Sequence, residues 1–355
     1  MSDGATPARG GLTKTHKRLL GGAVSAAIVV AVFVFFLPRI ADYRDVFTVV
    51  RELDWQDWLV LAGATLFNLV TFAPPWMAAL PGLGFRQAMA MTQASTALSI
   101  VSPAGAAVGM AGSYSMLRSW GFQPGPVGLA VAVTGVWNQF ANLAFPVFAL
   151  ALLTAVDESH PALTTAALIG AAVLVGVLGA FTLGLWRERW AHAFGDLAAR
   201  LTSRALRLVR RGPVAWGGER FVHFRSGTLG LLRRRWHVIT VATLVGHLTV
   251  FVLLLACLRV VGVSGSEIST VEAFAAWALV RILGALPLTP AGVGVVEIGL
   301  TGALVAFGAP NAEAVAATLL YRALTVFPTL ALGLLAAATW RSHHPGEALE
   351  SRRDL

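Results

Sequence analysis

Long runs of apolar residues dominate the chain, and their lengths are the first guide to its structure. A helix that crosses a bilayer needs about 20 apolar residues, because the hydrocarbon core is about 30 Å thick. Six stretches reach that length: 19–37, 58–80, 126–155, 162–186, 238–261 and 315–339. We therefore predict an all-α integral membrane protein with six spanning helices.

Two further apolar regions are interrupted by proline and glycine, at Pro103 and Gly105 in the first and at Pro290 and Gly292 in the second. Their arms are 87–101 and 106–118, then 272–288 and 294–307. Each arm is about 20–25 Å long as a helix, which is too short to span the core comfortably. Proline cannot continue a helix and glycine tolerates a tight turn. We therefore predict two re-entrant helical hairpins.

Composition agrees with a membrane protein, since 56% of the residues are hydrophobic and only 13% are charged. The formal charge is +9, and residues 187–237 alone hold twelve arginines and three acidic residues. With the N-terminal tail 1–18 in the cytoplasm, every basic cluster falls on the cytoplasmic side, as the positive-inside rule requires. The C-terminal tail 341–355 also falls there. We predict a multi-pass protein of the cell (plasma or inner) membrane.

The predicted topology makes the two halves of the single transmembrane domain, 19–340, resemble each other. Residues 58–155 read as span, hairpin, span, with the hairpin opening inward. Residues 238–339 repeat this order with the hairpin opening outward, and Phe145-Pro146 is echoed by Phe327-Pro328. This pattern predicts an inverted repeat, in which glycine- and proline-interrupted segments mark the substrate site of a transporter.

The basic segment 187–237 connects the two repeats and begins with a helical pattern. Apolar residues recur at steps of three and four from Trp190 to Leu208, and arginines fall off that face. The pattern predicts a cytoplasmic amphipathic surface helix with its apolar side on the membrane and its arginines near anionic head groups. The alternative is a solvated linker helix that only sets the orientation of the chain.

Three charged residues of the second repeat lie near the predicted midplane, at depths of roughly 13–18 Å. They are Arg281, Glu297 and Arg322. Two cations and one carboxylate leave about one net positive charge, which suits a lipid phosphate because arginine matches phosphate oxygens. Backbone N–H groups near Gly292 and Gly294 add donors where the second arm begins. The alternative is a buried ion pair that only locks the hairpin to the last span.

The first repeat has neutral polar groups where the second has charges. The candidates for a substrate site there are Pro103, Gly105, Gly109, Asn138 and Gln139. The amides, with Asn142 nearby, either line a polar groove or hydrogen-bond one helix to another, as polar residues in membranes often do.

Other classes of chemistry have little support. The single cysteine, Cys257, can form no internal disulfide, and the eight histidines show no metal-binding spacing. The sequence contains no GxSxG, HExxH or Walker motif and no nucleic-acid-binding motif. We therefore expect no catalytic residue, metal, cofactor or nucleic-acid partner.

The run from Arg281 to Glu297, followed by Tyr321-Arg322, resembles the lysylphosphatidylglycerol synthase transmembrane (flippase-like) family. That family typically shows a Pro-Gly-Gly-Leu-Gly-x-x-Glu hairpin followed by a Tyr-Arg helix. The matching positions here are Pro290, Gly292, Gly294, Glu297, Tyr321 and Arg322. The chain departs from the pattern at Ala291, where a second glycine is common.

The resemblance implies a lipid flippase or lipid-binding transporter that moves a phospholipid or a related anionic or aminoacylated lipid between leaflets. The partners would be lipid head groups, with a second copy or a synthase as a further partner. The soluble aminoacyltransferase domain of bifunctional members is not expected. One alternative is an enzyme, or its membrane subunit, in lipid-linked glycan or aminoacyl-lipid metabolism. Another is a scaffold that recruits partners through the arginine-rich helix.

Overall fold

The computed structural model describes residues 43–102, 105–156, 161–208, 217–284, 289 and 292–339. These residues form helices joined by short turns and contain no strand. The prediction of an all-α fold is confirmed. The predicted first span 19–37, both tails, Pro103 and Pro290 lie outside the described residues.

Five helical segments of the described chain are long and apolar enough to cross a membrane. They are α4 with α5 (Trp55–Thr71 and Ala73–Ala79), α8 (Pro124–Val156), α9 (Pro161–Trp186), α11 (Gly218–Val260) and α14 (Asn311–Thr339). These segments correspond to the five predicted spans that the structure describes. The protein is therefore a multi-pass, membrane-embedded helical protein.

Local sequence explains where the first of these segments begins and where it breaks. Asp54 caps α4, because its Oδ1 accepts hydrogen bonds from the backbone N–H groups of Gln56 and Asp57 at 2.8 and 3.0 Å. The helix is interrupted at Phe72, between α4 and α5. Pro74 and Pro75 follow in the first turn of α5, where a missing N–H is tolerated.

Two helices depart from the boundaries that the sequence predicts. The predicted span 238–261 is the C-terminal part of α11, which begins at Gly218 and has 43 residues. At about 65 Å it is far longer than the hydrocarbon core, so its first turns extend beyond the bilayer. A short helix, α3 (Tyr43–Arg51), lies between the first two predicted spans, 19–37 and 58–80, and contacts α14.

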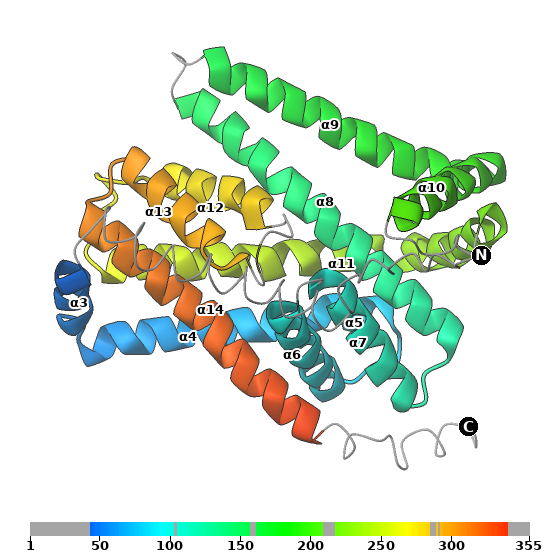
Figure 1. The fold of residues 1–355 in the computed structure, drawn as a ribbon, viewed down its shortest axis with the longest axis horizontal. Coiled ribbons are helices and arrows are strands. Elements are labelled where there is room, and N and C mark those ends of the chain that lie inside the picture. The colour runs from blue at the N-terminus through cyan, green and yellow to red at the C-terminus, as the bar shows by residue number, and fades with distance from the viewer. Residues whose placement is uncertain are drawn as a thin grey trace, which may run out of the picture.

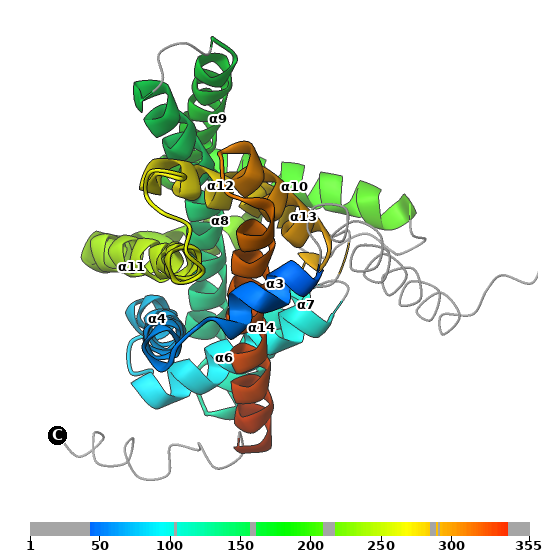
Figure 2. The same cartoon turned by 90° about the vertical axis from the view of Figure 1, so that its left-hand side faces the viewer.

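The basic segment begins with α10 (Glu188–Leu208), which coincides with the predicted amphipathic helix. It packs against both α9 and α11, so it is a fixed part of the fold as well as an amphipathic helix. The two views agree that α9 and α10 stand at the edge of the molecule (Figures 1 and 2).

The interrupted regions form two pairs of short helices. In the first pair α6 (Phe85–Val101) packs against α7 (Gly105–Ser119), and in the second α12 (Thr270–Gly284) packs against α13 (Val295–Ala306). Gly105 and Gly109 lie where α7 crosses α6, and a Cβ at either position would overlap an atom of Ser99. Glycine is therefore required there for close helix packing.

The two halves of the chain are fastened to each other through these pairs. The first arm of each pair packs on the last long helix of the other half: α6 on α14, and α12 on α8. The opening helices α4, α5 and α11 also pack together. Figure 1 shows α14 running from α13 at one end past α6 towards the other. The helix pairings of one half are thus repeated in the other.

We predict that Gly333→Ala destabilises the protein where α14 crosses α6. A Cβ at this position would overlap Ala97 and lie 2.8 Å from the Gln93 carbonyl oxygen. We expect a loss of about 1–3 kcal/mol in the free energy of unfolding, measured in detergent. The matched control is Gly302→Ala on α13, where no atom lies within 4 Å of the added Cβ. That change should be neutral or slightly stabilising, and equal losses in both variants would contradict the packing.

Candidate functional site

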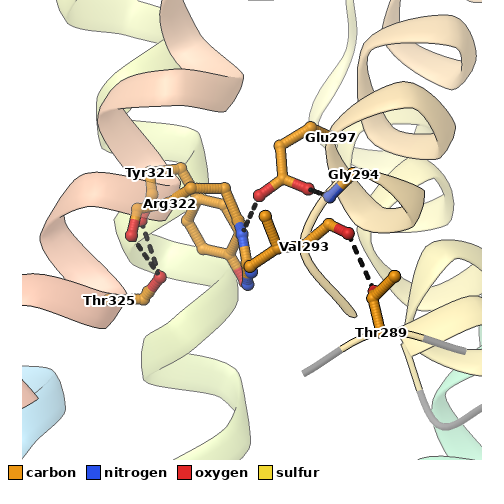
Figure 3. Close-up of polar contacts among 7 residues, drawn as sticks. All are labelled: Thr289, Val293, Gly294, Glu297, Tyr321, Arg322 and Thr325. Carbon is orange, nitrogen blue, oxygen red and sulfur yellow. Dashed lines mark hydrogen bonds and ion pairs between the residues drawn. The ribbon is translucent and has the colours of Figure 1, made fainter. Parts of the chain in front are cut away.

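The turn that leads into α13 depends on glycine for its backbone conformation. Gly292 has φ +66° and Gly294 has φ +90°, in the left-handed region that favours glycine. At Gly292 a Cβ would also lie 2.9 Å from Val296 Cγ2. The hydroxyl of Thr289 donates to the carbonyl oxygen of Val293 at 2.8 Å and closes the turn (Figure 3).

Glu297, in the first turn of α13, is 3% exposed and uses both carboxylate oxygens. Oε2 accepts a hydrogen bond from the backbone N–H of Gly294 at 2.6 Å. Oε1 accepts one from Arg322 Nε at 2.7 Å (Figure 3). This buried carboxylate therefore holds the start of α13 against the middle of α14, which is the geometry expected of a lock between the two helices.

Arg281, near the end of α12, is held by neutral groups. Its Nη2 donates to Asn142 Oδ1 at 2.5 Å and to His247 Nδ1 at 2.9 Å. The guanidinium carbon lies 4.7 Å from the centre of the Trp277 ring, within the range of a cation–π contact. Its Nε is buried and has no hydrogen-bond partner among the described residues. No carboxylate of the described chain pairs with Arg281.

A cavity of about 290 Å³ lies between Arg281 and Arg322, and residues from both halves of the chain line it. Its walls come from α8, α12, α13 and α14: Asn142, Trp277, Val280, Arg281, Gly284, Val296, Leu300, Tyr321 and Arg322. Two arginines line it, while Glu297, which contacts one of them, lies buried with both oxygens occupied. Because Arg281 lines the cavity and has no carboxylate partner among the described residues, this wall favours a hydrogen-bond acceptor, above all an anionic oxygen.

His247 of α11 is part of this site, although the sequence pattern predicted no role for it. Because arginine can only donate, His247 Nδ1 must accept from Arg281, and Nε2–H then donates to Asn138 Oδ1 at 3.1 Å. Edge-on contacts with Phe72 and Phe145 hold the ring. The spacing of the histidines indicates only that they do not form a metal site. The sequence feature that could have pointed to His247 is its place as a polar residue within the apolar run 238–261.

The predicted site residues fall into three groups. Arg281, Glu297, Tyr321 and Arg322 lie at or beside the cavity, and Gly292 and Gly294 shape the turn next to it. Asn138 and Gln139 of α8 are not among the lining residues but bond to the partners of Arg281: Asn138 to His247, while Gln139 Oε1 accepts from Asn142 Nδ2 at 3.2 Å. Gly105 and Gly109 lie instead in the α6–α7 crossing, where the structure gives them a packing role.

Comparison with known proteins places this site in a family. The model of the lysylphosphatidylglycerol synthase TM region matches residues 19–333. The chain belongs to this family. The match covers both short-helix pairs and every residue that lines the cavity. Membership of the lysylphosphatidylglycerol synthase TM family indicates a role related to membrane lipids. No curated protein matches the sequence.

We predict that Glu297→Gln destabilises the protein by about 3–5 kcal/mol, because the partly buried Arg322 loses its carboxylate partner. The double variant Glu297→Gln, Arg322→Gln should lose less than the two single variants added together. Unfolding in detergent provides all the terms of this double-mutant cycle. The control is Glu219→Gln at an exposed position, with an expected change within about 0.5 kcal/mol. Strict additivity would show that the ion pair is not a lock.

We predict that His247→Leu and His247→Gln differ in stability. Leucine removes the acceptor for Arg281 and should cost about 1–3 kcal/mol. Glutamine offers a carbonyl oxygen to Arg281 and an amide N–H to Asn138, so its loss should be smaller. Thermal unfolding of both variants measures the difference. A leucine variant at least as stable as the glutamine variant would show that the histidine only fills space.

Proposed function

We propose that this protein moves a phospholipid or a related anionic lipid between the leaflets of the membrane, and that the cavity beside Arg281 receives the head group. The observation that carries this proposal is Arg281 itself, which lines the cavity and has no carboxylate partner among the described residues. Its buried Nε also has no hydrogen-bond partner among them. A phosphate oxygen is the acceptor that a guanidinium matches best.

The charge distribution supports an anionic ligand. The Glu297 carboxylate is occupied by Arg322 and Gly294, so it leaves the positive charge of Arg281 uncompensated. The partners of Arg281, Asn142 and His247, are neutral acceptors that orient the guanidinium without cancelling its charge. An uncompensated cation at this depth would be costly in an empty apolar site, which is why intramembrane charges usually mark a function.

The helix pairings support an inverted repeat as the frame for transport. Each short-helix pair is docked on the other half, and each has arms too short to span the core. We propose that both pairs are re-entrant hairpins that open towards opposite sides of the membrane. We also propose that the protein lies in the plasma or inner membrane with both chain termini in the cytoplasm. Transporters of this kind bind substrate near the midplane, where the two repeats meet.

The route of the head group follows from the amides of α8. Asn138 and Gln139 are exposed near the middle of this helix, and both are linked by hydrogen bonds to the partners of Arg281. Exposed amides at this depth are best placed beside a wet groove rather than lipid tails. The head group would move along them to Arg281, while the acyl chains stay in the bilayer.

The proposal predicts that Arg281→Gln lowers leaflet exchange of labelled phosphatidylglycerol by roughly 10- to 100-fold in liposomes, the loss expected for one charged hydrogen bond. The exchange rate of Arg281→Lys should lie between those of the wild-type protein and Arg281→Gln, since lysine keeps the charge without the planar donors. The matched control is Arg235→Gln, an exposed arginine of α11, which should leave exchange unchanged.

Equal exchange in wild-type protein and Arg281→Gln, across several lipid classes, would refute the proposal. A lipid product that is chemically altered rather than moved would instead favour the alternative of an enzyme subunit.

A further inference from the structure

A second basic site lies outside the Arg281 cavity, between α10 and the start of α11. It is a pocket of about 450 Å³ whose described lining includes Arg200, Arg204 and Arg207 together with Asp196, Ser203 and Gly217. The three arginines are spaced by four and three residues, which places them on one face of α10. The helix therefore directs three guanidiniums into one concave surface.

These three arginines differ from the structural arginine beside them. Arg225 of α11 donates to the carbonyl oxygens of Leu185 and Trp186 at 3.0 and 3.1 Å, and so fastens α11 to the end of α9. Arg200, Arg204 and Arg207 are exposed and have no hydrogen-bond or ion-pair partner among the described residues.

The one carboxylate of the pocket does not neutralise them. Asp196 Oδ2 lies 3.0 Å from His192 Nδ1, one turn earlier on α10. Its Oδ1 lies beside the start of α11, since a Cβ at Gly217 would be 3.1 Å from it. Three guanidiniums against one carboxylate leave the pocket strongly positive, and the mutual repulsion of the arginines is relieved when an anion binds.

The neighbouring face of α10 indicates where that anion comes from. Trp190 and Leu197 are exposed, at 39% and 51%, and lie next to the arginines around the helix. An apolar strip flanked by arginines is typical of a helix at the membrane surface. Figure 2 shows α10 projecting sideways from the end of α9, at the edge of the molecule. Because α9 is long enough to span a bilayer and α10 follows its end, we expect the pocket at the membrane surface, near lipid phosphates.

We propose that this pocket is a second, peripheral binding site for the phosphate of an anionic lipid. The three forked donors match phosphate oxygens, and a phosphomonoester fits best because it carries a charge of about −1.5 to −2 at neutral pH. The site is separate from the head-group cavity, because the two sites share no lining residue. It would bind lipid at the membrane surface whether or not the protein transports lipid.

The test is native mass spectrometry of the full chain with phosphatidic acid, phosphatidylglycerol and phosphatidylcholine as probes. The triple variant Arg200→Gln, Arg204→Gln, Arg207→Gln should bind phosphatidic acid at least about 10-fold more weakly, the effect of losing a charged hydrogen bond. The control removes the same charge at Arg233, Arg234 and Arg235, which are exposed on α11. It should change binding less than about 2-fold.

Three outcomes would overturn the proposal. Equal losses in the two triple variants would show attraction to net charge rather than a site. Unchanged binding in the Arg200–Arg204–Arg207 variant would show that the pocket is empty of lipid. Displacement of phosphatidic acid by millimolar inorganic phosphate, with no preference for lipid, would assign the pocket to a soluble anion. Lysine at all three positions should retain part of the affinity, and serves as the variant of choice if glutamine impairs folding.

Discussion

Glu297 accepts a hydrogen bond from the backbone N–H of Gly294 and another from Arg322 Nε, with almost no exposure of its side chain. The first bond fixes the start of α13 after a turn that needs two left-handed glycines. The second bond joins the start of α13 to α14, which also packs against α6 from the first half of the chain. The position of the second short-helix pair, and the shape of the cavity beside it, therefore depend on this carboxylate.

The same pairing decides the charge of the cavity. Because Arg322 contacts Glu297, Arg281 is the cation that remains without a carboxylate among the described residues. Its orientation comes from α8 and α11, through Asn142 and His247, and from the face of Trp277. Pro146 lacks the N–H that would bond to the carbonyl of Asn142 one turn earlier, so α8 has an interrupted hydrogen-bond ladder at this point. A helix from each repeat thus contributes to one polar site.

Sequence alone predicted the features that depend on local pattern. Apolar run length located five of the helices, and Pro103 and Pro290 with their glycines located the breaks between short arms. The predicted depths of Glu297 and Arg322 also indicated that these two residues lie together.

Two features of the structure could not be predicted from local sequence pattern. Residues 218–237 are too basic to read as part of a spanning helix, yet packing on α10 continues α11 through them. The contact of His247 with Arg281 joins residues of different helices, and no spacing rule connects them.

The central claim is that Arg281 meets a lipid head group in the cavity. The most direct measurement is an experimental structure of the protein in nanodiscs that contain phosphatidylglycerol. We expect head-group density with an oxygen within about 3.2 Å of a guanidinium nitrogen of Arg281, while Glu297 stays bonded to Arg322. A map in which Arg281 swings over to Glu297, or in which the cavity wall is sealed by side chains with no lipid beside it, would contradict the account.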